Sequence, residues 1–522
     1  MSTKARHTIE YLIRMGLMIV LGSSLLFSSV PVALAASGVG NVPQGLQTNG
    51  SYAGSFAANK VTNIMVTSQQ VSCYRPEDPY FVNDGPNDGY TGMSACNGAA
   101  TTGENTGTSP YPTQVGSNPG YPANLPMLVK DHSESDIRVD PTNPNHLIGS
   151  SKWFVSAEGY NHLLGFYESF DGGKTWPVQG HIPGYEGWTD NTDPVGAFDG
   201  FGDFYELILP YQFFYNNNGS HNFTVGTVQE PNPVVAAEVI SVAVRPAGSV
   251  RAGQWITTRN GSPDIIASYD SKGNEPDKQW ITIDNNPASP SYNTIYAMWV
   301  NFSGISPKPF VSTAKALPGG KHTNWTTPIL LPTVNNTASD TFLLPHVDPA
   351  GVIYTPVANF PSKGSFCCGT LSVDFSKDAG KTWQGPLVVA QNIILSPARY
   401  ANTTFRSGIL ESFAVGSRLS AAGSYPLYMA WEDYSAGLAN VLLSASYDGG
   451  ITWSGPIQVN DNVAAVDEFQ PNLATASDGT VSVNFYDRRL ACPAAGSAEA
   501  LGAGLALDTV NPRYSGALPP YG

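Results

Sequence analysis

Two polar segments, each following a strand-like apolar run, contain residue types that could do acid–base chemistry. Glu432 directly follows the run that ends at Trp431, and Tyr486 begins a Tyr-Asp-Arg-Arg segment whose third residue is Arg488. A carboxylate beside a tyrosine can accept the phenol proton and make that oxygen a nucleophile. A guanidinium group can bind a carboxylate through two parallel hydrogen bonds. These segments are therefore the first candidates for a functional site.

The sequence lacks the motifs of several other reaction classes. It contains no HExxH or paired CxxC zinc motif, no EF-hand loop, no GxSxG nucleophile elbow and no P-loop. We therefore expect neither a metal nor a cofactor.

The composition restricts the fold that must position such residues. Only 13% of the 522 residues are charged, about half the share usual for a soluble domain. The chain holds 53 glycines and 41 prolines, which excludes a coiled coil or a long-helix protein. Since 41% of the residues are hydrophobic, the chain can still bury a sizeable core. We expect an all-β protein with many turns.

The net charge restricts the partners. The formal charge of −15 repels phosphate backbones and anionic lipids, so we expect no nucleic-acid partner and no peripheral membrane role. An anionic substrate would need a local basic pocket. We expect a monomer.

The N-terminal segment has the features of an export signal. Basic residues, Lys4 among them, precede an apolar run from Met15 to Phe27, and Ala33-Leu34-Ala35 supplies the small residues of a cleavage site. A retained membrane anchor is the alternative, but glycine and serine interrupt the run. We predict a signal peptide over 1–35, cleavage after Ala35 and an extracellular protein.

Residues 36–130 form a second region, rich in Gly, Asn, Ser, Thr and Pro, which we interpret as a loose arm. The odd count of five cysteines leaves at least one unpaired within the chain. Cys73 and Cys96 are the pair we expect to form a disulfide, because it would staple this arm.

Residues 131–522 contain an internal repeat. The pattern S-x-D-x-G-x-T-W begins at Ser169, Ser376 and Ser446 and contains the aspartates Asp171, Asp378 and Asp448. The starts lie 207 and 70 residues apart, so a period near 69 accounts for both intervals. The aspartate and glycine suit a tight turn between two strands. A repeat of this length, with about four strands in each unit, indicates the blades of a β-propeller.

A second landmark marks the head of each unit, where a polar residue leads a short apolar strand. The six heads are Asp136–Val139, Asp193–Phe198, Asp277–Ile283, Asp340–Leu344, Thr404–Ile409 and Asp467–Leu473. They predict six blades, although the 392 residues from Asp131 to Gly522 hold only about 5.7 periods. The last blade is therefore incomplete, or the N-terminal segment closes it.

The repeated pattern resembles the Asp box of the sialidase superfamily, also called the BNR repeat. The resemblance covers about three quarters of the chain and implies a six-bladed sialidase-type β-propeller. It further implies that Asp171, Asp378 and Asp448 are structural and lie opposite the active site. Head residues and the ends of second strands would then line the functional face.

The resemblance also implies roles for individual residues. In sialidases three arginines clamp the substrate carboxylate, and Arg138, Arg406 and Arg488 are the candidates here. Tyr486 would be the nucleophile, Glu432 its base and Asp136 the acid/base residue. The sequence departs from true sialidases at the Arg-Ile-Pro motif, which it lacks. The residues alone leave another interpretation open, in which Arg138 pairs with a neighbouring aspartate and Arg488 caps its strand.

Three functions fit this sequence. The first is a secreted exo-acting glycoside hydrolase of sialidase type. The second is a non-catalytic propeller that binds glycans or proteins, and the third is a propeller hydrolase that uses two carboxylates on other sugars. The Asp box cannot separate them because it reports the scaffold only.

Overall fold

The computed structural model describes residues 132–154, 162–185, 188, 190–211, 214–215, 228–229, 238–269, 275–302, 307–332, 339–360, 367–397, 400, 411–461 and 465–488. The chain divides into two units, Met1–Asn41 and Val42–Gly522, and every described residue belongs to the second. Cys73 and Cys96 lie outside the described residues, as does the boundary at residue 131.

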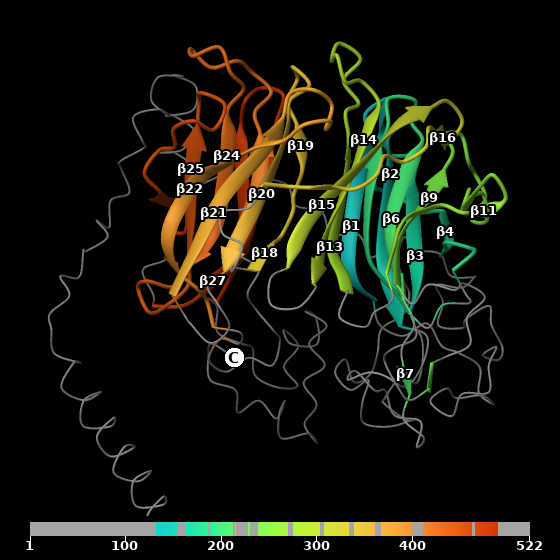
Figure 1. Ribbon diagram of the computed structural model, residues 1–522, viewed down its shortest axis with the longest axis horizontal. Helices are drawn as coiled ribbons and strands as arrows, with labels where there is room; N and C mark the ends of the chain where they lie inside the picture. Colours follow the sequence, from blue (N-terminus) through green and yellow to red (C-terminus); the bar gives the residue numbers. More distant parts are fainter. Residues whose placement is uncertain are drawn as a thin grey trace, which may run out of the picture. The chain divides into compact units, whose positions relative to one another are not determined.

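The described residues form five antiparallel sheets of four or five strands, which we call blades 1 to 5 (Figure 1). Blade 1 contains β1 (His132–Asp140), β2 (Asn143–Phe154), β3 (His162–Ser169) and β4 (Val178–His181). Blade 2 contains β5 (Asp190–Phe198), β6 (Phe204–Tyr211), β9 (Glu238–Arg245) and β12 (Ile265–Tyr269). Blade 3 contains β13 (Glu275–Ile283), β14 (Thr294–Phe302), β15 (Lys308–Leu317), β16 (Lys321–His322) and β17 (Ile329–Leu330).

Blade 4 contains β18 (Ser339–Thr341), β19 (His346–Val347), β20 (Ile353–Phe360), β21 (Cys367–Ser376) and β22 (Gln384–Ile394). Blade 5 contains β23 (Glu411–Val415), β24 (Leu427–Asp433), β25 (Asn440–Ser446) and β26 (Ile457–Gln458). A further pair, β27 (Glu468–Thr475) and β28 (Val481–Asp487), packs on blade 5 and is called the blade 6 pair. Two short hairpins complete the described strands: β7 (Phe214–Tyr215) with β8 (Val228–Gln229), and β10 (Thr258–Arg259) with β11 (Ser262–Pro263).

The apolar core is divided among the interfaces between successive sheets. One cluster joins blades 2 and 3 around Trp299, and another joins blades 4 and 5 around Trp431. Both tryptophans lie in second strands and are fully buried, because these strands have a sheet on each face and bury both sets of side chains. The all-β, multi-bladed prediction is confirmed for the described residues. A complete sixth blade stays a prediction.

The three repeated motifs form turns with the same hydrogen bonds, each between the third and fourth strands of its blade. In the first, Asp171 accepts hydrogen bonds from the Thr175 amide at 2.9 Å and the Thr175 hydroxyl at 2.7 Å. Asp378 and Asp448 accept the equivalent pairs from Thr382 and Thr452. The glycine of each motif has a positive φ, which favours the residue without a Cβ. We call the end of the sheets that carries these turns the box end.

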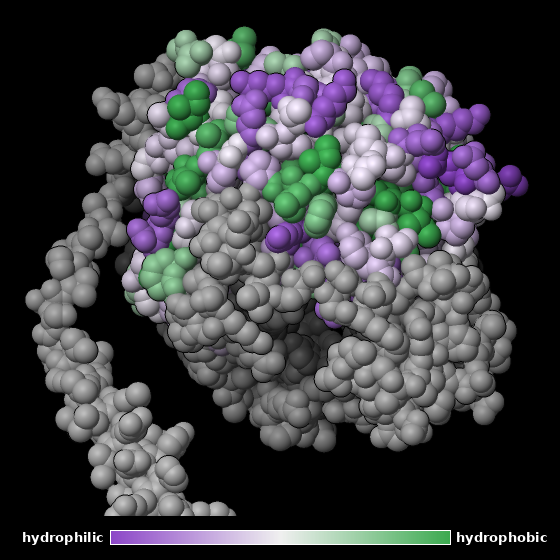
Figure 2. Space-filling view, viewed as in Figure 1, coloured by the Kyte–Doolittle hydropathy of each residue, from purple (hydrophilic) through white to green (hydrophobic). Residues whose placement is uncertain are grey.

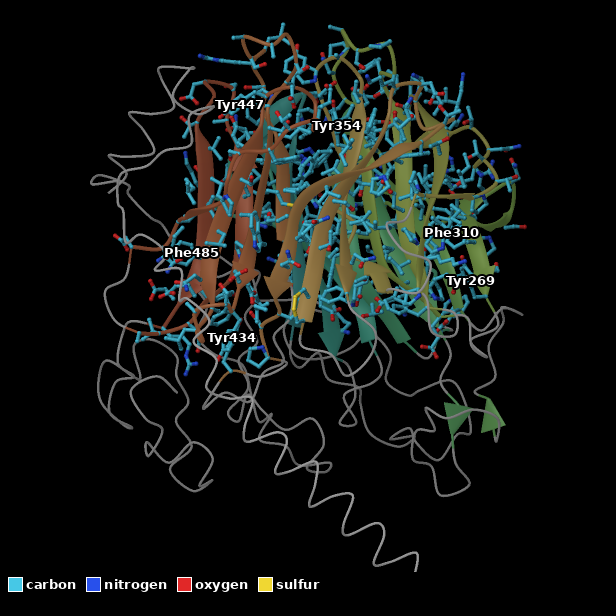
Figure 3. The ribbon with its side chains drawn as sticks, turned by 60° about the vertical axis from the view of Figure 1, so that its left-hand side comes forward. Tyr269, Phe310, Tyr354, Tyr434, Tyr447 and Phe485 are labelled. Atoms are coloured by element: carbon cyan, nitrogen blue, oxygen red, sulfur yellow. A yellow bond between two sulfur atoms is a disulfide. The ribbon has the colours of Figure 1, made fainter. Side chains whose placement is uncertain are left out.

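The register of the strands places several of the predicted site residues at the other end, which we call the opposite end. In β24, Leu427 pairs with Ser446 at the box end, whereas Asp433 pairs with Asn440 at the opposite end. Figure 3 shows the same separation: Tyr434 lies at one end of the blades and Tyr447 at the other. Glu432 therefore lies at the opposite end, as does the first half of β1.

The innermost strands share a bulge that the sequence did not indicate. A residue other than glycine adopts a φ between 50° and 58° in four of these strands, at Glu134, Asp193, Lys278 and Gln470, and Phe342 does so directly after β18. In these four strands the register with the neighbouring strand shifts at this point. The bulges lie toward the opposite end and therefore shape the entrance of the candidate site.

Two further findings concern the described residues as a whole. Within them, no helix is long and apolar enough to span a membrane. Cys367 and Cys368, adjacent at the start of β21, are joined by a disulfide.

Figure 2 shows hydrophobic patches interspersed with hydrophilic residues on the described part of one face.

Candidate functional site

A tyrosine–carboxylate pair lies between blade 5 and the blade 6 pair. Glu432, near the end of β24, is fully buried, and its Oε2 accepts the hydroxyl hydrogen bond of Tyr400 at 2.5 Å. Its Oε1 accepts the backbone N–H of Gln470, the bulge residue of β27, at 2.7 Å. Burial raises the pKa of Glu432, although these hydrogen bonds oppose the shift. The pair has the arrangement in which a carboxylate can take a phenol proton.

Tyr486 occupies a different place from the one expected. Its side chain is 63% exposed, and its ring stacks on Phe469 with centroids 5.5 Å apart and an angle of 18° between the planes. The hydroxyl that Glu432 binds is that of Tyr400, not that of Tyr486. The Tyr486–Phe469 stack therefore presents an aromatic face at the opposite end, of the kind that packs against sugar rings.

An ion pair lies beside these aromatic residues. Arg488 Nη1 is 3.1 Å from Asp467 Oδ2, and both side chains are at least nine-tenths buried. Asp467 also accepts the backbone N–H of Ala439 at 3.1 Å, so the aspartate links the blade 6 pair to blade 5. Asp467 contributes electrostatically to the raised pKa of Glu432, after burial.

Arg138 lies in blade 1 and reaches toward other blades. Its Nε is 2.9 Å from Asp136 Oδ2, and that oxygen also accepts the Gly196 N–H of blade 2 at 2.9 Å. The guanidinium lies 5.7 Å from the ring centre of Trp280 in blade 3. Burial, and secondarily the Arg138 charge, lowers the pKa of His346 in blade 4 to about 4. Arg138 thus interacts with residues of blades 1, 3 and 4, and its partner Asp136 binds blade 2.

The structure assigns Arg138 and Arg488 to separate aspartates, Asp136 and Asp467. This arrangement corresponds to the interpretation in which each arginine pairs locally. Arg406 lies outside the described residues. Asp136 and Glu432 are both at the opposite end, on blades 1 and 5.

Sequence reasoning missed several polar residues at the opposite end. Tyr400 has no repeated motif around it, so only its position after β22 places it beside Glu432. Glu134 precedes the predicted head aspartate by two residues and is held by Lys152 at 3.1 Å. The alternation of β1 alone does not indicate that Glu134 sits on a bulge. Within the described ranges, no group of three or more His, Cys, Asp or Glu side chains is placed to bind a metal ion.

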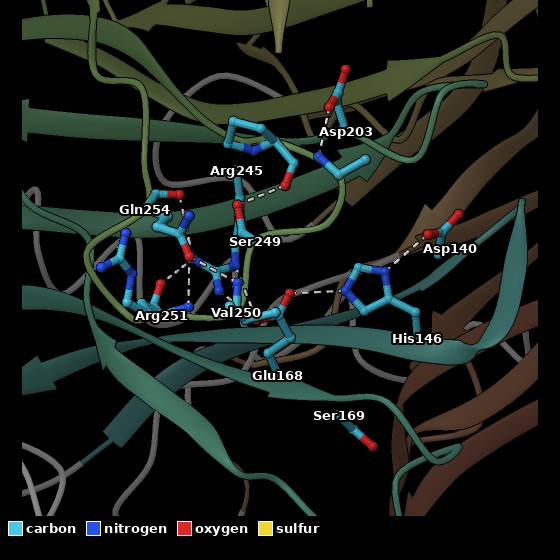
Figure 4. Close-up of polar contacts among 12 residues, drawn as sticks. Asp140, His146, Glu168, Ser169, Asp203, Arg245, Ser249, Val250, Arg251 and Gln254 are labelled. Atoms are coloured by element: carbon cyan, nitrogen blue, oxygen red, sulfur yellow. Dashed lines mark hydrogen bonds and ion pairs between the residues drawn. The ribbon is translucent and has the colours of Figure 1, made fainter. Parts of the chain in front are cut away.

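A separate polar network at the box end connects blades 1 and 2 (Figure 4). His146 contacts Asp140 through Nδ1 and Glu168 through Nε2, both at 2.9 Å. Glu168 also binds the fully buried Arg245, at 3.0 Å to Nε and 2.5 Å to Nη2. Because all four side chains lie within the sheet interface, we interpret the network as structural.

Comparison with known proteins identifies similar solved structures at low identity. No protein-family model matches the chain, and no curated protein matches it. A mutant NanB sialidase of Streptococcus pneumoniae is 12% identical over 72% of this chain and 58% of that chain, with a TM-score of 0.32. The α-L-arabinofuranosidase of Fusarium graminearum, in complex with an iminosugar inhibitor, is 10% identical over 72% and 96%, with a TM-score of 0.37. A protein of unknown function from Dyadobacter fermentans is 12% identical over 72% and 79%, with a TM-score of 0.34. At these TM-scores we base the fold on the sheets themselves.

Proposed function

We propose that this protein is a glycoside hydrolase that acts on the terminal sugars of glycans. Its active site would lie at the opposite end of the blades. The hydrogen bond between Tyr400 and Glu432 carries this proposal. Tyr400 is 2% exposed, so the proposed reaction requires the sugar to gain access to its hydroxyl. Glu432 then takes the phenol proton while Tyr400 Oη attacks the anomeric carbon and the glycosidic bond breaks. Water then hydrolyses the glycosyl–tyrosine bond, so the configuration is retained. Asp136, whose side chain is 17% exposed, remains the proposed acid/base residue for the leaving oxygen.

The finer assignment, an exo-α-sialidase, depends on guanidinium groups that are available to a substrate carboxylate. Arg138 and Arg488 are each paired with an aspartate, and an anionic sugar would have to compete with these pairs. Assays should therefore include neutral glycosides as well as an α-sialoside.

The experiment measures release of a fluorogenic leaving group from an α-sialoside, a neutral pyranoside and a neutral furanoside. Tyr400→Phe and Glu432→Gln should lower kcat by about 10³-fold or more, because each removes part of the nucleophile pair. Tyr428→Phe is the matched control, since Tyr428 is a buried tyrosine in the box-end half of the same strand. Wild-type turnover that Tyr400→Phe leaves intact would refute the role of Tyr400.

A second candidate is a non-catalytic glycan-binding propeller, which the exposed Tyr486–Phe469 stack favours. It predicts that folded wild-type protein binds sugars but releases no leaving group from any of the three glycosides. Tyr486→Ala should then weaken binding, whereas Tyr486→Phe should retain it because the stacking ring remains.

We also propose that the protein acts outside the cell, from the export-signal features of residues 1–35. Secretion with a mature N-terminus at Ala36 would support this proposal, and an uncleaved intracellular protein would contradict it.

A further inference from the structure

A polar cluster apart from the proposed catalytic residues lies where blades 1 and 2 meet at the opposite end. Lys152 of β2 contacts the Thr192 hydroxyl at 2.7 Å and Glu134 Oε2 at 3.1 Å. The same hydroxyl lies 3.0 Å from Glu134 Oε2 and 2.5 Å from Asp193 Oδ1. The Asp193 backbone N–H also points to Glu134 Oε2 at 3.3 Å. Two blades thus hold two carboxyl groups beside each other.

Glu134 is the accessible carboxyl group of the pair, and Lys152 forms an ion pair with it. The Glu134 side chain is 45% exposed, whereas Lys152 is only 11% exposed and is directed into the cluster. Burial raises the pKa of Glu134, and the hydrogen bond with Asp193 raises it further, whereas Lys152 lowers it.

A buried amide from blade 3 provides an independent observation. Gln279 is 3% exposed, and its Nε2 donates to the Asp193 carbonyl at 2.6 Å. Its Oε1 has no hydrogen-bond partner, although it is buried. A buried acceptor of this kind normally finds a donor. Gln279 Oε1, on the side chain that contacts Asp193, is therefore an acceptor without a donor.

We propose that Glu134, Asp193 and Gln279 form a binding subsite for the hydroxyl groups of a neutral sugar unit. Adjacent carboxyl groups can each accept one hydroxyl of a neighbouring pair on the sugar ring, and the ligand supplies the donors that the cluster lacks. A carboxylate or phosphate would bring only further acceptors, so the subsite selects against acidic sugars. This subsite rests on the proposed function only in that the ligand is a glycan.

The test measures binding by calorimetry in the Tyr400→Phe protein, so that turnover cannot consume the ligand. The probes are the methyl glycosides of galactose, arabinose and xylose, together with the methyl glycoside of galacturonic acid, which matches galactose except for its carboxylate. We expect at least one neutral glycoside to bind, and the galacturonide to bind about tenfold or more weakly than the galactoside, because one charge-assisted contact is worth about that factor. Glu134→Gln and Asp193→Asn should each weaken binding of the neutral probe by about tenfold.

Glu275→Gln is the matched control, because Glu275 is an exposed glutamate at the opposite end of β13 and should leave binding within about twofold of the parent. Loss of ordered structure in a variant is checked by its thermal unfolding. The proposal is overturned if the galacturonide binds more tightly than every neutral probe, if no neutral probe binds, or if Glu134→Gln matches Glu275→Gln. Hydrolysis by wild type that Glu134→Gln leaves unchanged would count against this subsite alone. Binding here with no turnover by wild type would count against the hydrolase alone.

Discussion

Glu432 accepts its phenol hydrogen bond from Tyr400 at 2.5 Å, while Tyr486 stacks on Phe469 with its ring exposed. The two tyrosines therefore have different capacities. Tyr400 can exchange a proton with a buried carboxyl group, and Tyr486 can offer an aromatic surface. This difference separates the chemistry proposed for the site from its contact with a sugar ring.

The buried carboxyl of Glu432 should make stability depend on pH. Its folded pKa is raised above 4.5, so its contribution is present below about pH 4.5 and is lost as the pH rises through the folded pKa. Glu432→Gln has no ionisable carboxyl group at this position, so it does not lose this stability as the pH rises. Urea unfolding should therefore show the variant gaining stability relative to wild type between pH 4.5 and 7.5, by about 1.4 kcal/mol for each unit of pKa shift. An equal difference at both pH values would contradict the prediction.

His146 should contribute a second pH dependence at the box end. Burial disfavours the imidazolium, but the hydrogen bonds to Glu168 and Asp140 outweigh it and raise the pKa of His146. Its stabilisation is therefore present below about pH 6.5 and is lost as the pH rises through the folded value. His146→Phe leaves two buried carboxylates without this partner and should cost about 3 kcal/mol at pH 6. Denaturant titrations at pH values from 5.5 to 8.5 measure the free energy of unfolding. This free energy should change less with pH in the variant than in wild type.

Arg138 should be detectable through His346 in blade 4. Burial is the main reason that the pKa of His346 falls to about 4, and the Arg138 charge adds to it. Arg138→Met should therefore raise the pKa of His346 while leaving it below 6.5. An NMR titration of the His346 ring measures this shift, and Lys278→Met serves as a control because Lys278 is a cation that pairs with Asp277 in blade 3. If Arg138→Met leaves the pKa of His346 unchanged, the Arg138 charge does not act on this histidine.

Asp448 should matter for stability and not for the site. It accepts three hydrogen bonds, from the Thr452 amide and hydroxyl and from Ser446, which hold its pKa below the usual range even though partial burial opposes them. Asp448→Ala should cost about 1 kcal/mol after allowance for its exposure to solvent. Binding and turnover should be unchanged. The native contribution is present above about pH 4 and is lost as the pH falls through the lowered pKa.

The sequence was sufficient to predict the sheets because their signals are local and repeated. The motifs at Asp171, Asp378 and Asp448 specify turns through contacts within eight residues, and the apolar head strands recur at a regular interval. The sixth blade could be predicted only in part, since its repeat has no motif after β28.

The site was harder to predict because its partners come from different blades. Glu432 could be placed near the end of its strand from the sequence, but its tyrosine depends on how the chain after β22 returns toward β24. The pairing of Arg138 with Asp136 could be read from their spacing of two in one strand, which puts both side chains on the same face. The cluster at Glu134 depends on a bulge and on Lys152 and Thr192, which are 40 residues apart in the chain.

At the repeated bulge the backbone conformation is constant, whereas the side chain differs from one strand to the next. Residues with acidic, basic and amide side chains take nearly the same φ in four strands, at Glu134, Asp193, Lys278 and Gln470, and the aromatic Phe342 takes it directly after β18. The conformation there is imposed by the surrounding sheet rather than by the residue type. These positions are therefore natural sites for divergence after duplication of a blade. Exchanging the side chains at these positions can change which ligand binds at the opposite end, while the strands keep their register.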